Sequence, residues 1–163
     1  MKIGILGSGD VAQTLAAGFL RHHHEVVIGT RDPSKLAEWA KHNPHGRVGS
    51  FTEAARFGEV AVLAVKGNVV AEAIRGAGAA NLAGKPVIDA TNPIADAPPV
   101  NGVLRFSTNL DESMMERLQH EFAALHFVKA FNSVGSGRMV NPQFAGGNRR
   151  CSSVAMMPAR KRR

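Results

Sequence analysis

Two short stretches hold residues whose types and spacing suit the binding of a dinucleotide. The first, "GSGDVA", gives Gly7-x-Gly9-x-x-Ala12 between an apolar strand pattern and an amphipathic helix pattern. In such a turn the first glycine permits the sharp bend, the second lets the backbone approach a pyrophosphate, and a small third residue allows close helix–strand packing. The amides at the positive end of the helix would face the phosphates. The pattern predicts a cofactor site that includes Gly7, Ser8, Gly9, Asp10 and Val11.

The second stretch, "GTRDPSK", follows the next predicted strand, where an NAD site usually has an acid for the ribose 2′-hydroxyl. Here Thr30 offers a hydroxyl, Arg31 a planar fork for a phosphate and a face for adenine, and Lys35 a further positive charge. These three residues favour NADP(H) over NAD(H). Asp32 leaves an alternative open: it is either the cap of a helix that starts at Pro33, or the ribose acid displaced by two positions.

Three further stretches follow predicted strands: "LAVKGN" (63–68), "DATNP" (89–93) and "VKAFNSVG" (128–135). In a doubly wound sheet, ligands bind at the carboxyl ends of the strands. We therefore expect Val65 beneath the central ribose of the cofactor, and the other two stretches on the nicotinamide side. Asp89 and Lys129 are either an acid/base pair or structural partners, and the pattern favours the structural role.

"HHH" at residues 22–24 suggests a metal site only weakly, because consecutive side chains diverge and no Cys/His cluster with ligand spacing accompanies them. A polar turn from helix to strand is the favoured interpretation. The chain contains no nucleophile elbow, Walker loop or zinc motif, so we assign no catalytic residue and no metal ligand.

Strand and helix patterns alternate along the chain. Strands are expected at residues 2–7, 25–30, 47–49, 60–65, 86–90 and 126–131, and the run 60–65 is apolar throughout, as in a strand covered on both faces. Helices are expected after the glycine turn, from Pro33, from Thr52, and over 69–80 and 113–124, the last capped by Asn109 or Asp111. This order predicts an α/β, Rossmann-like, doubly wound fold: a mainly parallel sheet of about six strands with helices on both faces.

Length and composition suit one globular domain. The chain has 163 residues, 44% of them hydrophobic and 20% charged. Its longest apolar run, "VAVLAV", is far shorter than the roughly 20 residues that span a bilayer. "MKIGILG" runs straight into a strand pattern without a signal-peptide cleavage region, and Cys151 is the single cysteine. We expect a cytoplasmic protein that does not bind membranes.

The net charge of +7 comes from the last residues of the chain. Residues 148–163 hold six basic and no acidic residues, and without these six the 20 basic residues fall to 14 against 13 acidic ones. We therefore divide the chain into a dinucleotide-binding domain, 1–147, and a basic tail, 148–163, that is not a domain. A tail that binds nucleic acid or a membrane is the alternative, but it lacks interleaved aromatic residues and an amphipathic pattern.

Several segments together resemble the deazaflavin (coenzyme F420)-dependent NADP oxidoreductase family: "KIGILGSGDVAQTLAAGFL", "HEVVIGTRDPSK", "LAVKGN", "VIDATNP", "NLDESMMERLQ" and "FVKAFNSVG" with "MVNPQF". The resemblance runs from Met1 to about Gly147. It implies hydride transfer between NADP(H) and a deazaflavin or flavin-like acceptor. It also implies an NADP site lined by residues 8–11 with Thr30, Arg31, Lys35, Val65 and Ala130.

The tail departs from the family pattern. After "NPQFAGG" that pattern continues into a further strand, whereas this chain has "NRRCSSVAMMPARKRR". One choice of codons for the tail, shifted by a single base, encodes "PTMFICGNDARAKAA", which restores that strand and the start of a helix. We therefore expect a frameshifted, truncated member of the family.

Two functions remain open at this stage. The first is an NADPH-dependent reductase of a flavin-like acceptor, and the second is an NADP(H)-binding sensor or inactive module without turnover. Loss of the last strands would expose an apolar edge, so a homodimer is also an expectation.

Overall fold

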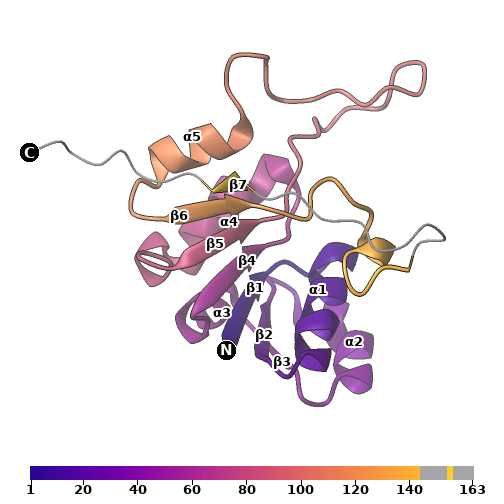
Figure 1. Cartoon of the computed structure of the whole chain (residues 1–163), viewed down its shortest axis with the longest axis vertical. Coiled ribbons are helices and arrows are strands. Elements are labelled where there is room, and N and C mark those ends of the chain that lie inside the picture. The colour runs from indigo at the N-terminus through magenta and orange to yellow at the C-terminus, as the bar shows by residue number, and fades with distance from the viewer. Residues whose placement is uncertain (144–153, 156–163) are drawn as a thin grey trace, which may run out of the picture.

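A single sheet organises the chain (Figure 1). The computed structural model describes residues 1–143 and 154–155. Its strands, in the spatial order β3-β2-β1-β4-β5-β6-β7, are β1 (Lys2–Leu6), β2 (Glu25–Gly29), β3 (Arg47–Gly49), β4 (Val60–Leu63), β5 (Pro86–Asp89), β6 (His126–Lys129) and β7 (Val154–Ala155). The first six pair in parallel, and β7 pairs antiparallel with β6. The predicted doubly wound α/β fold is confirmed.

Helices cover both faces of the sheet. Helices α1 (Asp10–Arg21) and α2 (Ala37–His42) pack on one face, and α3 (Phe51–Phe57), α4 (Val70–Ala77) and α5 (Met114–Glu121) pack on the other (Figure 1). Two separate buried clusters result, because successive strand residues point to opposite faces. Thus Ile5 belongs to the α1/α2 cluster, whereas Leu6 belongs to the α3/α4/α5 cluster.

Helix starts show where the sequence prediction needs correction. The expected cap of α5 at Asn109 or Asp111 is wrong. Ser113 is the N-cap: its hydroxyl accepts a hydrogen bond from Glu116 N–H at 3.2 Å, and Glu116 Oε2 accepts one from Ser113 N–H at 2.7 Å. Asn109 instead stabilises the turn before the helix, because its side-chain oxygen accepts from the backbone N–H groups of the second and third residues after it. The reciprocal Ser–Glu pair is a capping box, which satisfies two N–H groups at the start of the helix.

The basic tail, 148–163, lies mostly outside the described residues, as does the predicted boundary at 147/148. Within it the structure describes only β7, which forms an additional edge strand that the sequence analysis did not predict. No helix in the described part of the chain is long and apolar enough to cross a bilayer.

A long arm, residues 94–110, leaves the sheet after β5 and returns to α5. It contains no helix or strand and is braced by two isolated bridges, Ile94 with Phe106 and Val100 with Val103. The arm carries most of the large hydrophobic side chains that are exposed on the described residues, among them Val103, Phe106 and Leu110. In Figure 1 it projects well beyond the sheet.

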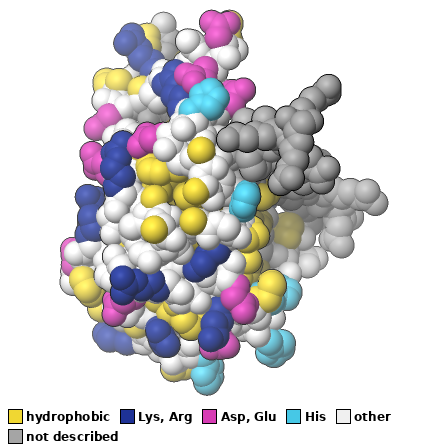
Figure 2. Space-filling view, turned by 90° about the vertical axis from the view of Figure 1, so that its left-hand side faces the viewer, with side chains coloured by type: hydrophobic (Ala, Val, Ile, Leu, Met, Phe, Trp, Pro, Cys, Tyr) yellow, Lys and Arg dark blue, Asp and Glu magenta, His cyan; other side chains and the backbone are white. Residues whose placement is uncertain are grey.

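Basic side chains form no single field on the face shown in Figure 2. Lys and Arg are spread over that face, with acidic side chains among them and an apolar patch between. This distribution agrees with a body in which charges nearly balance once the tail is set aside.

The assignment of Ser113 as a cap makes a testable prediction. Ser113→Ala should lower the free energy of unfolding by about 1 kcal/mol, because it removes the acceptor for a helix N–H. Ser113→Asp, which keeps an acceptor, should retain most of the stability. Urea denaturation would measure both changes, and a larger loss from Asn109→Ala than from Ser113→Ala would contradict the assignment.

The same cap predicts a pH dependence. Hydrogen bonds from the Ser113 backbone N–H and hydroxyl lower the pKa of Glu116 below its usual 4.5. A carboxyl whose pKa is lower in the folded state stabilises that state above its unfolded pKa and loses this effect as the pH falls through the folded pKa. The difference in stability between wild type and Ser113→Ala should therefore be full at neutral pH and shrink below about pH 4.5.

Candidate functional site

The turn between β1 and α1 is formed as the glycine pattern predicts. Gly7 has φ 141°, and a Cβ on it would lie 2.1 Å from the carbonyl oxygen of Ala64. Its N–H donates to the carbonyl of Gly29 at 3.0 Å. Only glycine fits there, because a side chain would have to occupy the space of the backbone directly after β4.

The first turn of α1 is left open toward solvent. Gly9 is the N-cap and provides no side-chain hydrogen bond, and a Cβ built on it meets no atom within 4 Å. The first backbone N–H groups of a helix have no partners within the helix, so this end suits an anion. Gln13 holds the turn, because its side-chain amide donates to the carbonyl of Ser8 at 2.9 Å.

The residues after β2 show Asp32 in the role of a cap. Its Oδ1 accepts hydrogen bonds from the Ser34 backbone N–H at 3.1 Å and from the Ser34 hydroxyl at 2.6 Å, and these bonds lower the pKa of Asp32. Asp32 thus caps the 3₁₀ turn Pro33–Leu36. Thr30, buried behind it, accepts from the Asp32 N–H at 3.1 Å. The cap interpretation is confirmed.

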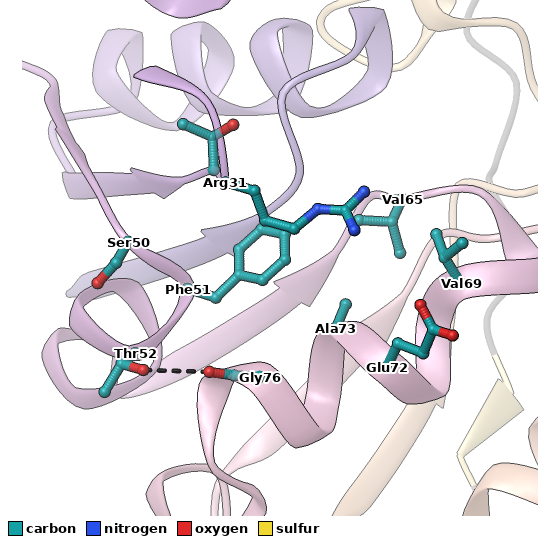
Figure 3. A pocket seen from close by; sticks show the side chains of 10 residues that line it. Arg31, Ser50, Phe51, Thr52, Val65, Val69, Glu72, Ala73 and Gly76 are labelled. Atoms are coloured by element: carbon teal, nitrogen blue, oxygen red, sulfur yellow. Dashed lines mark hydrogen bonds between the residues drawn. The ribbon is translucent and has the colours of Figure 1, made fainter.

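A pocket of about 390 Å³ opens beside these residues, and we call it the Arg31 pocket (Figure 3). The Arg31 side chain reaches from the end of β2 across the pocket toward Val65, while Phe51 enters from α3 and Glu72 from α4. Its lining comprises Thr30, Arg31, Ser50, Phe51, Thr52, Val65, Val69, Glu72, Ala73 and Gly76.

A second pocket, of about 430 Å³, lies at the point where the strand order reverses, between β1 and β4. We call it the switch-point pocket. It is lined by Gly9, Asp10 and Val11 after β1, by Ala64, Val65, Lys66, Gly67 and Asn68 after β4, and by Ala90, Thr91, Asn92, Ile94, Ala95 and Asp96 after β5. Open α/β sheets bind their ligands at such a switch point. Val65 lines both pockets and therefore joins them.

Comparisons with known proteins agree with this geometry. A family described as NADP oxidoreductase coenzyme F420-dependent matches residues 2–93, more than half of the chain. The chain belongs to this family. The matched region contains the glycine turn, Arg31 and Val65, and the ends of β1, β2, β4 and β5. A comparison with curated proteins gives no match.

Solved structures of other proteins share the fold. A protein from Arthrobacter sp. FB24 assigned as an F420-dependent NADP reductase is 34% identical, with a TM-score of 0.81 over 87% of this chain and 67% of its own. A hypothetical protein from Sinorhizobium meliloti is 21% identical (TM-score 0.69, 84% and 63%). A reductive aminase from Aspergillus terreus, solved with NADPH and ethyl levulinate, is 16% identical (TM-score 0.61, 83% and 42%). The chain spans about two thirds or less of each.

Six of the ten predicted site residues line one or both of the pockets. Thr30, Arg31 and Val65 line the Arg31 pocket, and Gly9, Asp10, Val11 and again Val65 line the switch-point pocket. The other four predicted residues, Gly7, Ser8, Lys35 and Ala130, line neither pocket. Gly7 and Ser8 shape the turn, Lys35 is exposed in the 3₁₀ segment, and Ala130 N–H donates to the Asp89 carbonyl at 3.2 Å.

Sequence reasoning missed the wall of the Arg31 pocket that α3 and α4 provide. Ser50 and Glu53 form a capping box at the start of α3, and the Ser-x-x-Glu spacing would have located that helix end. Glu72 and Ala73 carry no comparable pattern, because their part in the pocket follows from the packing of α4 rather than from local sequence.

Asp89 and Lys129 form a structural pair. Lys129 Nζ donates to Asp89 Oδ2 at 2.9 Å and to the Thr91 carbonyl at 2.5 Å, while the Thr91 hydroxyl donates to Asp89 Oδ1 at 2.6 Å. Asp89 is fully buried and Lys129 is 19% exposed at the side chain. The two Lys129 bonds tie the end of β6 to the end of β5, and the Thr91 bond stays within the β5 end. The pair thus holds Thr91, which lines the switch-point pocket.

The three consecutive histidines form the predicted turn between α1 and β2. His22 Nε2 is 3.2 Å from Asn141 Oδ1, His23 has φ 60°, and the ring of His24 packs on Phe19. Their rings thus have different surroundings. Across residues 1–143 and 154–155, no group of three His, Cys, Asp or Glu side chains could hold a metal ion.

The Asp89–Lys129 pair predicts a large effect on stability. Lys129→Met should lower the free energy of unfolding by about 3–5 kcal/mol, because it leaves a buried carboxylate without its counter-charge. The double variant Asp89→Asn/Lys129→Met should recover part of this loss.

Lys41→Met is the matched control, since Lys41 pairs with Glu38 on the surface, where both side chains are more than two-thirds exposed. It should cost less than about 1 kcal/mol. Denaturant titration of the four proteins would measure these differences. Equal losses from Lys129→Met and Lys41→Met would contradict the assigned role.

Proposed function

We propose that this chain binds NADP(H) across the two pockets and takes part in hydride transfer between NADPH and a deazaflavin or flavin-like acceptor. The observation that carries the proposal is Arg31: a guanidinium lines the pocket at the end of β2, where a ribose-binding acid would otherwise stand. The carboxylate next to Arg31 in the chain, Asp32, is engaged in its cap through Oδ1. The family's description and the reductase from Arthrobacter support the same cofactor and acceptor.

Successive parts of the cofactor are assigned to residues along the carboxyl ends of the strands. In this proposal the Arg31 pocket receives the adenosine with its 2′-phosphate, and the exposed Lys35 adds positive charge near it. The amides of Ser8 to Val11 receive the pyrophosphate, where no side chain of Gly9 blocks the approach. Val65 lies beneath the central ribose, and the segments after β5 and β6, including Ala130, lie on the nicotinamide side.

The acceptor side of the proposal rests on the arm. When bound, NADPH supplies a hydride, and the protein's part in such a transfer is chiefly to place two rings in contact. Ile94 lines the switch-point pocket, and Phe106 is bridged to it across the arm. Residues opposite each other in an antiparallel bridge share a face, so the arm offers an apolar surface beside the nicotinamide end.

The cofactor assignment is tested by calorimetric titration with NADP and, separately, with NAD. The wild-type chain should bind NADP at least about tenfold more tightly, and Arg31→Ala should remove most of that preference, because a charge-assisted hydrogen bond contributes about 1.5–3 kcal/mol. Arg21→Ala, which removes the same charge at the far end of α1, is the control and should leave the preference intact. Tighter binding of NAD by the wild type would contradict the proposal.

The acceptor assignment is tested by steady-state oxidation of NADPH with deazaflavin and flavin acceptors. Phe106→Ser should raise the KM for the acceptor several-fold, because it removes apolar surface beside the pocket, and should leave the affinity for NADP unchanged. Val103→Ser, at an exposed arm position bridged to Val100 instead of to a pocket-lining residue, should change neither. Binding of NADP without oxidation of NADPH by any such acceptor would favour the alternative, a binding module without turnover.

A further inference from the structure

The Arg31 pocket contains two opposite charges that do not neutralise each other. Arg31 enters from the end of β2 and Glu72 from the first turn of α4 (Figure 3). Within residues 1–143 and 154–155, neither side chain makes an ion pair or a hydrogen bond. A pocket with an unpaired cation on one wall and an unpaired carboxylate on the other suits a ligand with an anionic group at one end and a hydrogen-bond donor at the other.

The surface between the two charges is suited to a flat ring. Phe51 and Val65 are partly buried against the core, Ala73 is buried, and Val69 lies beside them in the pocket lining. The hydroxyls of Thr30, Ser50 and Thr52, which also line the pocket, already donate to the Asp32 carbonyl, Glu53 Oε2 and the Gly76 carbonyl. The Glu72 carboxylate is therefore the acceptor available to the edge of a ring near α4. The Glu72 carboxylate lies at that edge, beside Val69 and Ala73 (Figure 3).

Glu72 is exposed and stands in the first turn of α4. An ionised carboxylate only accepts hydrogen bonds. It therefore attracts an amino group and repels a carbonyl oxygen at the same place.

We propose that Glu72 accepts a hydrogen bond from the 6-amino group of adenine and so makes the Arg31 pocket selective for 6-aminopurine nucleotides over 6-oxopurine nucleotides. This inference rests on the proposed binding of NADP(H) in this pocket, with the 2′-phosphate at Arg31. A purine with a carbonyl at position 6 would place an acceptor against the carboxylate, and its donor would move to the ring N1–H, away from the position that suits the 6-amino group. Glu72 would thus recognise the base, while Arg31 binds the 2′-phosphate.

The test compares two ligands that differ only in the donor and acceptor groups at positions 6 and 1 of the base, NADP and nicotinamide hypoxanthine dinucleotide phosphate, by calorimetric titration. The wild type should bind NADP about tenfold more tightly, near the lower end of what a hydrogen bond to a charged group contributes. Glu72→Gln should bring the two affinities to within about threefold, because an amide both donates and accepts. The ratio cancels the general effect of the lost charge on the phosphates, since both ligands carry the same phosphates.

Glu38→Gln is the matched control, because it removes the same charge from an exposed surface pair, and it should keep the wild-type ratio. Equal affinities of the wild type for the two ligands, or an unchanged ratio in Glu72→Gln, would overturn the inference while leaving the proposed function intact. Failure of the wild type to bind either ligand would overturn the proposed cofactor and this inference together.

Discussion

The close approach of Gly7 to the backbone of β4 is the constraint on which the site depends. A side chain at this position would overlap the Ala64 carbonyl, and the Gly7 N–H is held by the Gly29 carbonyl at the end of β2. One residue therefore links the ends of three strands, β1, β2 and β4. The start of α1, the Thr30–Arg31 segment and Val65 all follow directly from those ends, so their relative positions are fixed before any ligand is considered. Rigid placement of this kind lowers the ordering cost of binding.

Much of the fold was predictable because the sheet buries both of its faces. Parallel strands covered by helices are continuous apolar runs, and the runs around β1, β2, β4 and β5 stand out in the sequence. The ends of elements were harder to predict. The helix expected over 69–80 divides into a 3₁₀ turn, Gly67–Val69, the helix α4 and another 3₁₀ turn, Ala79–Asn81. Such divisions depend on where neighbouring backbones approach, and propensity along the chain does not contain that information.

The residues of the candidate site also differ in whether local sequence predicts them. Gly7, Gly9 and Arg31 could be predicted because each lies in a short turn directly after a strand, where the local sequence pattern itself indicates the site. Glu72 was not found, because it reaches the Arg31 pocket through the packing of α4 against α3. Ala130 was named by resemblance, yet it lines neither pocket, and what the structure shows for it is a backbone bond to β5. Asp89 and Lys129 were visible as charged residues in apolar strands, but only their geometry separates a structural pair from an acid and a base.

The two pockets have different physical characters, and this difference bears on what can vary within the fold. The Arg31 pocket is bordered by a strand end and two helices, and both of its charges come from these regular elements or directly follow them. The switch-point pocket is bordered on one side by the arm, which has no helix or strand and exposes its large apolar side chains. Proteins below 25% identity share this fold, including a reductive aminase, and a fold alone does not determine a substrate. Surface loops tolerate changes in sequence better than the elements they connect, so the arm can change without moving Gly7, Arg31 or Val65.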